Sequence, residues 1–188
     1  MSIMNKKRGF LLLECIAYIS LVLVLFLFFY SLSNNFIEHY KKVSTSMNLQ
    51  ESGEVIEKFF KAEMKMQGNV VGLFVKNKGL ISYDEYNDED ILAFFYTNTY
   101  LKERADIYET FTFAFKVIES SEKLILCKNV PRVTSNIGSL VGYEVANHIN
   151  NIKIEKIDNE NFFVIISLAN NDIIYVHKFH IRNKIREA

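Results

Sequence analysis

Residues 6–32 read KKRGFLLLECIAYISLVLVLFLFFYSL, a short basic leader followed by an apolar run. The run extends from Phe10 to Leu32, which is long enough for one helix to span a membrane. Glu14 is its only acidic residue. A carboxylate in hydrocarbon costs on the order of 3 kcal/mol, so a membrane helix carries one where some partner uses it. Glu14 is therefore the first candidate functional residue of the chain.

The residues before Glu14 follow a definite order, in which a basic leader is followed by Gly9, then Phe10, then the glutamate at the fifth position counted from Phe10. This order resembles the class III signal of type IV prepilins and pseudopilins, which a prepilin peptidase cuts after the glycine. The resemblance implies cleavage between Gly9 and Phe10 and N-methylation of Phe10. It also implies that the apolar helix stays on the mature protein.

Each part of this signal has a physical role. Basic residues hold the leader in the cytoplasm, and Gly9 presents no side chain that would obstruct a protease at the membrane face. Glu14 is about one helical turn from Phe10. By the resemblance, the Glu14 carboxylate pairs in a fibre with the terminal amine of a neighbouring subunit and sets the axial register. The leader charges are Lys6, Lys7 and Arg8.

Three other interpretations account for part of the N-terminal pattern. A removable secretory signal fits the small residues Ser31 and Ser33, but its apolar core is normally about 7 to 15 residues long and would not contain Glu14. A lipoprotein signal that uses Cys15 requires a small residue in place of Glu14. A plain single-span anchor leaves Glu14 unexplained. The prepilin interpretation accounts for all of the features together.

The composition indicates one exported domain attached to the helix. Of the 188 residues, about 150 follow the apolar run, and hydrophobic residues make up 49% of the chain, so it can form one core. Basic and acidic residues both number 22, and loss of the three leader charges leaves 19 against 22, a net charge of −3. This balance argues against a strongly basic nucleic-acid surface. Cys15 and Cys127 are expected to be separate small hydrophobes and not a disulfide.

The pattern predicts a leader at 1–9, a transmembrane half-helix at 10–32, an amphipathic half-helix at 33–67 and a β-domain at 68–188. Gly53 is the weak point inside the helix, at about 1 kcal/mol relative to alanine. We expect the amphipathic half to dock on the β-domain through apolar residues at helical spacing. These residues are Phe36, Tyr40, Val43, Met47, Ile56, Phe59, Phe60 and Met64.

Period-two alternation after the helix predicts antiparallel strands. One hairpin is expected across 76–79, with Asn77 and Gly79 at positive φ, and another across 169–172. The alternation at 111–117 predicts a strand with one buried face. The expected strands are 70–75, 80–83, 91–97, 111–117, 124–127, 152–155, 162–168 and 173–181.

These elements define an α+β fold class, with a long N-terminal membrane-spanning helix packed on a mostly antiparallel β-domain. The pilin resemblance implies the same architecture, and the large β content is closest to the PilW/PulJ-like minor pilins or to late-competence minor pseudopilins. Two departures from the family pattern occur. Leu11 stands where threonine is frequent, and the membrane half lacks the proline of many major pilins, which predicts a straighter helix.

Motifs for catalysis, phosphate binding and metal chelation were not found in the sequence, so we expect no catalytic residue, no metal site and no cofactor. The odd spacing of His177 and His180 directs them to opposite faces of a strand, and we expect His177 to face solvent and His180 to be structural. Residues 84–90 contain five carboxylates, which we interpret as a solvated acidic turn in preference to a calcium site.

Basic residues are expected along the edge of the C-terminal strand. We interpret them as side chains that keep the protein soluble by preventing strand-on-strand association, in preference to a DNA-binding surface, because phosphate contacts need a clustered basic face. These residues are Lys178, Arg182, Lys184 and Arg186.

The sequence therefore predicts a noncatalytic minor pilin or pseudopilin of a type IV pilus, competence or type II secretion fibre or of its initiating tip complex. The partners that this implies are prepilin peptidase, other pilin or pseudopilin subunits, the inner-membrane assembly platform and membrane lipid. The protein would be a single-pass protein of the cytoplasmic membrane with an exported C-terminal domain. The alternative is a membrane-tethered module that binds an envelope ligand or DNA and is not assembled into a fibre, and a secreted enzyme is a weaker third hypothesis.

Overall fold

Helix α1 (Ile3–Met64) is 62 residues long and precedes all of the strands that the structure describes. Its continuity is consistent with the sequence, because no proline occurs before position 131. The predicted helix end at residue 67 lies outside the described residues. The computed structural model describes residues 3–64, 69–102, 107–130, 133–158 and 160–182, with side chains from Phe10 onward except 99–109 and 129.

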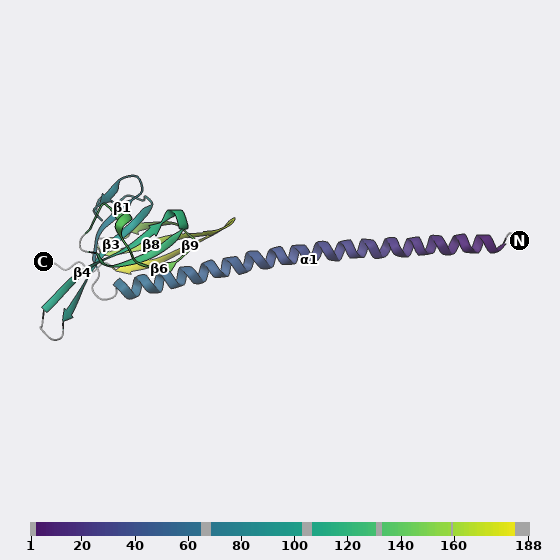
Figure 1. Ribbon diagram of the computed structural model, residues 1–188, viewed down its shortest axis with the longest axis horizontal. Coiled ribbons are helices and arrows are strands. Elements are labelled where there is room, and N and C mark those ends of the chain that lie inside the picture. The colour runs from purple at the N-terminus through teal and green to yellow at the C-terminus, as the bar shows by residue number, and fades with distance from the viewer. Residues whose placement is uncertain (1–2, 65–68, 103–106, 131–132, 159, 183–188) are drawn as a thin grey trace. The chain divides into compact units, whose positions relative to one another are not determined.

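The chain divides into two compact units, Met1–Ser44 and Thr45–Ala188, and α1 contributes to both of them (Figure 1). The first unit consists of the N-terminal part of α1. The second unit contains the rest of α1 and both β-sheets.

The larger sheet has six antiparallel strands in the order β2-β1-β3-β4-β5-β6. Consecutive strands are hydrogen-bonded neighbours except β2 and β3, between which β1 lies. This simple connectivity follows from the short turns between alternating segments. The strands are β1 (Asn69–Val75), β2 (Gly79–Ile81), β3 (Ile91–Lys102), β4 (Ile107–Ile118), β5 (Lys123–Val130) and β6 (Tyr143–Ala146).

The smaller sheet has three antiparallel strands in the order β7-β8-β9, namely β7 (Ile149–Lys156), β8 (Asn161–Asn170) and β9 (Ile173–Arg182). The predicted hairpin between β8 and β9 is confirmed, since Asn170 pairs with Ile173 and Asn171 has a φ of 53°. A left-handed asparagine is typical of such a two-residue turn. Two short 3-10 helices, Glu119–Ser121 and Ile137–Ser139, complete the described elements.

The first predicted hairpin has the expected position, with Val75 opposite Gly79. Gly79 has a φ of 77°, whereas Asn77 does not have a positive φ, so that part of the prediction was wrong. Strand β3 continues to Lys102, beyond its predicted end, and β6 was not predicted at all. The ends of strands are set by pairing with neighbouring strands as well as by local sequence.

Phe60 lies at the centre of the main core, which the second-unit part of α1 forms with both sheets. Its ring stacks on Phe115 with 3.8 Å between centroids. It also makes edge contacts with Phe94 at 5.8 Å and Phe179 at 5.6 Å. Because Phe94 and Phe115 belong to β3 and β4 and Phe179 belongs to β9, one buried ring joins the helix to both sheets.

A second, smaller cluster covers the other face of the larger sheet. Ala114 and Lys116 on β4 are buried there, beneath the segment 133–140. Lys116 Nζ donates hydrogen bonds to the carbonyl oxygens of Gly138 at 3.5 Å and Leu140 at 3.3 Å, so it fixes this segment over the sheet. The prediction of one buried face for 111–117 was therefore wrong, because a loop that is distant in sequence covers the second face.

The docked stripe of α1 differs in part from the predicted one. Ile56, Phe60 and Met64 are buried as expected, but Met47 is 65% exposed, whereas the unpredicted Leu49 is 1% exposed. At about 100° per residue, positions 47 and 49 lie on nearly opposite sides of the helix. The predicted residues Phe36, Tyr40 and Val43 belong to the first unit and are exposed, and Phe59 is half-buried.

Gly53 lies on the docked face and allows α1 to approach β9 closely. A Cβ atom at this position would be 3.0 Å from Cβ of His177 and 3.2 Å from the Tyr175 ring. The glycine that the sequence marks as a weak point thus leaves room for the side chains of β9.

The predicted α+β class is confirmed as one long apolar N-terminal helix followed by mostly antiparallel sheets. The docked segment and the two sheets share one core, so the second-unit part of α1 is an integral layer of the β-domain.

Replacement of Phe60 by alanine (Phe60→Ala) should lower the free energy of unfolding of the β-domain by about 3 to 5 kcal/mol, because a fully buried ring is removed from contacts with both sheets. Denaturant unfolding of the full chain in mild detergent measures this change. Phe36→Ala is the matched control, since Phe36 is 73% exposed and should change the midpoint little. A loss for Phe60→Ala below about 1 kcal/mol would contradict the central role of this ring.

Candidate membrane and assembly segment

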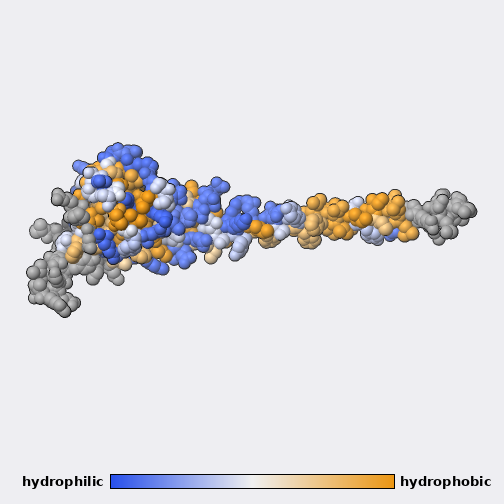
Figure 2. All heavy atoms as spheres, viewed as in Figure 1, coloured by the Kyte–Doolittle hydropathy of each residue, from blue (hydrophilic) through white to orange (hydrophobic). Residues whose placement is uncertain are grey.

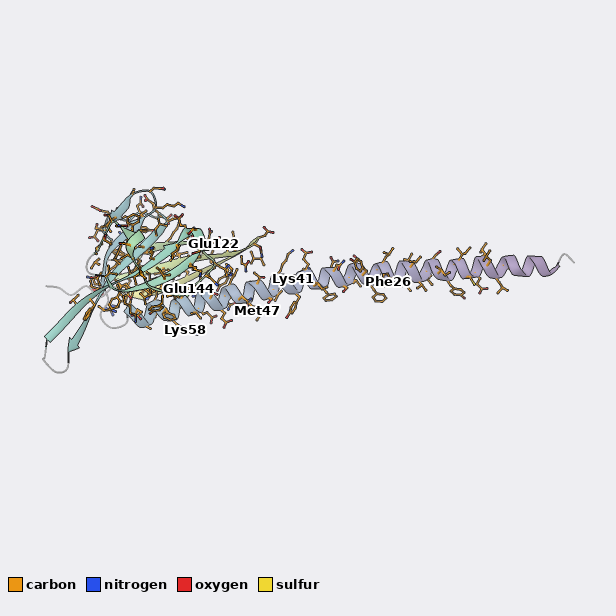
Figure 3. All side chains as sticks on the ribbon, viewed as in Figure 1. Phe26, Lys41, Met47, Lys58, Glu122 and Glu144 are labelled. Carbon is orange, nitrogen blue, oxygen red and sulfur yellow. The ribbon has the colours of Figure 1, made fainter. Side chains whose placement is uncertain are left out.

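The first part of α1 presents a continuous apolar surface. Large hydrophobic side chains between Phe10 and Leu32 are 38% to 75% exposed, and no residue of the most apolar window is buried. Figure 2 shows these hydrophobic residues along the N-terminal part of the helix, and Figure 3 shows Phe26 projecting from it. In the described residues, α1 is the one helix that is long and apolar enough to cross a membrane.

The length of this apolar segment matches a bilayer. From Phe10 to Leu32 the helix rises about 34 Å, against about 30 Å for the hydrocarbon core. All backbone groups inside it can be satisfied by the helix itself, as a membrane requires. Ser20 is satisfied in the same way, because its hydroxyl donates to the carbonyl oxygen of Ile16 at 2.8 Å. Among the residues that the structure describes, this is therefore the one segment suited to span a membrane.

Glu14 is exposed on this helix, about one turn beyond Phe10 and about 6 Å further along the axis. Residues four apart lie on one face of a helix, so the carboxylate and the position of Phe10 share a side. Within the described part of the chain, no ion pair or hydrogen bond involves the Glu14 side chain. Any partner for this carboxylate in an apolar environment must therefore come from outside the chain or from residues that the structure does not describe.

The predicted leader residues continue the same helix. Lys6, Lys7, Arg8 and Gly9 belong to α1, and their side chains lie outside the described residues. The structure thus places the predicted cleavage position between Gly9 and Phe10 on one helix with Glu14.

A polar contact supports the docking of α1 on the smaller sheet. Glu57 Oε1 lies 2.5 Å from Lys61 Nζ, and Glu57 Oε2 lies 2.7 Å from His177 Nε2. The Tyr175 hydroxyl is 3.4 Å from Nδ1 of His177, and the two rings stack. The hydrogen bond from Lys61, aided by that from His177, lowers the pKa of Glu57 although partial burial acts in the opposite direction.

The end of α1 is held by two further contacts. The Asn98 side chain on β3 donates a hydrogen bond to the carbonyl oxygen of Glu63. Lys128 Nζ on β5 lies 3.6 Å from the Glu63 carboxylate. Because the last carbonyls of a helix have no partner within the helix, the bond from Asn98 satisfies one of them.

His177 and His180 lie on opposite faces of β9, as expected, but their roles were assigned the wrong way round. His177 faces α1, and its side chain is only 13% exposed. His180 faces solvent and contacts Asn161 Oδ1 at 3.1 Å. The alternation of side chains along a strand places these two residues on opposite faces. Which of the two is buried depends on the face on which the helix packs.

The acidic turn at 84–90 is balanced by lysines. Lys78 Nζ lies 2.5 Å from the Glu89 carboxylate, and Lys153 Nζ lies 3.5 Å from that of Asp88. The Tyr86 hydroxyl donates to the Glu89 carbonyl at 2.7 Å and accepts from the Ile154 amide at 3.1 Å, which ties the turn to β7. Among the described residues, no group of three or more His, Cys, Asp or Glu side chains is arranged to hold a metal ion.

The remaining candidates form structural contacts where they are described. Cys15 is exposed on α1, and Cys127 is buried in the second cluster, where burial raises the pKa of its thiol. Lys178 pairs with Glu155 at 2.6 Å and Arg182 with Glu160 at 3.1 Å. The other two predicted edge residues, Lys184 and Arg186, lie outside the described residues.

Three features were missed by the sequence analysis: Leu49, strand β6 and the Glu57–His177 contact. Leu49 is four residues before Gly53 and seven before Ile56, a helical spacing that could have been recognised. Strand β6 has only four residues and follows a loop, so it carries little periodic signal. The contact between positions 57 and 177 has no local signal at all.

No family model matches this chain, and no curated protein and no solved structure matches it. Its function is therefore inferred from its own residues and geometry.

Substitution of glutamine for Glu57 (Glu57→Gln) should lower the free energy of unfolding at neutral pH by about 1 to 2 kcal/mol, because it removes charge-assisted contacts to Lys61 and His177. The folded-state pKa of Glu57 is lowered, so its stabilising effect is present above the reference value of 4.5 and is lost as the pH falls through the folded-state value. The difference between wild type and variant should shrink as the pH falls below 4.5. Urea unfolding at a series of pH values measures it.

The control is Glu38→Gln, which removes a similar pair with Lys42 from an exposed part of α1 and should leave stability unchanged. A Glu57→Gln effect that stays constant from pH 7 to below the folded-state pKa would contradict the role given to this carboxylate.

Proposed function

We propose that this protein is a minor pilin or pseudopilin, made as a precursor and assembled through α1 into a fibre or its initiating tip complex. The observation that carries the proposal is Glu14, a lone carboxylate on an exposed apolar helix, at the fifth position counted from Phe10. Phe10 itself directly follows the basic leader and Gly9. The host machine is a type IV pilus, a competence apparatus or a type II secretion system.

In this proposal the leader determines the first step. The positive charges of Lys6, Lys7 and Arg8 keep the N-terminus in the cytoplasm while the apolar segment enters the membrane. Prepilin peptidase then cuts after Gly9, and Phe10 becomes the N-methylated terminus. The domain that follows α1 is exported, which agrees with a single apolar segment and with the absence of a second one from the described chain.

Assembly replaces lipid by neighbouring helices around the apolar segment. Lipid and helix side chains are similarly apolar, so packing and polar contacts, more than hydrophobicity, select the assembled state. Glu14 supplies the polar contact, since its carboxylate pairs with the cationic terminus of a neighbouring subunit and neither charge then remains unpaired in hydrocarbon. Because this ion pair forms at one fixed position along the fibre axis, it sets the axial register between subunits.

The β-domain has a structural role in this scheme. Phe60 and the Glu57–His177 contact join the docked part of α1 to both sheets, so this part of the helix belongs to the domain. No catalytic step is assigned to it.

A membrane-tethered binding module that is never assembled would also need the apolar segment. It would have no use for Glu14, because a carboxylate without a partner only weakens membrane insertion. The position of this residue therefore favours the fibre subunit.

We expect Glu14→Ala to leave cleavage after Gly9 intact but to reduce incorporation into the fibre at least tenfold. A tenfold reduction corresponds to a loss of about 1.4 kcal/mol in the free energy of pairing. Immunoblots that compare sheared fibres with the membrane fraction measure incorporation. Glu38→Ala removes a carboxylate from the same helix beyond the apolar run and should assemble normally. Normal incorporation of Glu14→Ala would contradict the proposed register contact.

A further inference from the structure

Strand β6 forms an edge of the six-stranded sheet and pairs only with β5. The pairing joins Leu124 with Ala146 and Leu126 with Tyr143, with a register shift between them. In the part of the chain that the structure describes, no backbone hydrogen bond links 143–146 to an element other than β5. An edge strand of this kind presents N–H and C=O groups that a further strand can use.

A groove of about 400 Å³ lies beside this edge, and all of its lining belongs to the second unit. Helix α1 provides one wall, and β6 with the following Asn147 provides the other. Figure 3 labels Glu144 on the β6 wall. The lining residues on which the proposal depends are Glu51, Ser52 and Val55 on the helix and Glu144, Val145 and Ala146 on the strand.

The charge of the groove is acidic. Its lining contains the carboxylates of Glu51 and Glu144 and no basic side chain. Lys123 Nζ lies 2.6 Å from the Glu144 carboxylate and balances it in part. Glu51 is exposed and has no ion-pair partner among the described side chains. A cation that enters the groove would therefore gain its strongest attraction at Glu51.

The other outer strands lack this combination. Strand β9 carries Lys178 and Arg182, and β7 carries Lys153 and Lys156, side chains of the kind that discourage strand addition. Strand β2, the other edge of the larger sheet, has no charged side chain and does not line the groove. Strand β6 has no basic residue and carries one carboxylate, which repels acidic strands and attracts basic ones.

We propose that the groove between α1 and β6 binds an extended basic segment of a neighbouring subunit, which adds to β6 as a further strand and places a lysine or arginine at Glu51. This inference rests on the proposed function, because a fibre or tip complex supplies neighbouring subunits. Main-chain hydrogen bonds to β6 provide affinity, and the two carboxylates select the charge of the segment. The half-buried Val55 and Val145 contact its apolar side chains.

Three synthetic hexapeptides test this with the full chain in mild detergent. The first alternates lysine and valine, the second alternates glutamate and valine, and the third is the first peptide with N-methyl groups on alternate amides. Amide chemical shifts and fluorescence polarisation report where and how tightly each peptide binds. We expect the lysine peptide to bind with shifts centred on β6, the glutamate peptide not to bind, and N-methylation to weaken binding at least tenfold, because it blocks strand pairing.

Glu51→Gln should weaken the lysine peptide about tenfold. Glu54→Gln is the matched control, since Glu54 is an exposed carboxylate on the same helix that does not line the groove. Absence of binding, shifts away from β6, or equal binding of the N-methylated peptide would each overturn the proposal. A subunit that assembles normally but binds no lysine peptide would overturn this proposal alone, whereas an N-terminus that is not cut after Gly9 would contradict the proposed function whatever the peptides do.

Discussion

The apolar surface of α1 between Phe10 and Leu32 is the constraint on which the rest of the molecule depends. Each large side chain that leaves water there contributes about 1.5 to 3 kcal/mol, and within the described structure none of this surface is buried. Such a helix must be covered by lipid or by other helices. Glu14 adds a second constraint. The apolar environment that suits the neighbouring side chains disfavours the charged carboxylate unless a cation is placed beside it.

The same helix meets a different environment in the second unit. Leu49, Gly53, Ile56, Phe60 and Met64 face the sheets, and the close approach at Gly53 brings His177 to Glu57. One continuous backbone therefore carries a segment suited to a membrane and a segment that is part of a domain core. The proposed assembly uses both, since the first segment would pack among neighbouring helices and the second is a layer of the domain.

Features with a local signal could be predicted from the sequence. The length of the apolar run, the position of Glu14, the β8–β9 hairpin and the burial of Phe60 each depend on residues close together in the chain. Features that depend on distant residues could not. Met47 was expected to dock and is exposed, the segment 133–140 covers the second face of β4, and His177 is turned toward the helix. For the proposed assembly segment the motif alone predicts roles for Gly9, Phe10 and Glu14, because their expected partners belong to other molecules.

In the proposed function, the carboxylate of Glu14 is retained in an apolar helix because cleavage frees a terminal amine at a fixed distance from it. Mass spectrometry of the protein isolated from its native membrane tests this proposal. We expect a mature chain that begins with N-methylated Phe10. A chain that retains its leader, or one that begins near Asn34 after removal of the whole apolar segment, would contradict it.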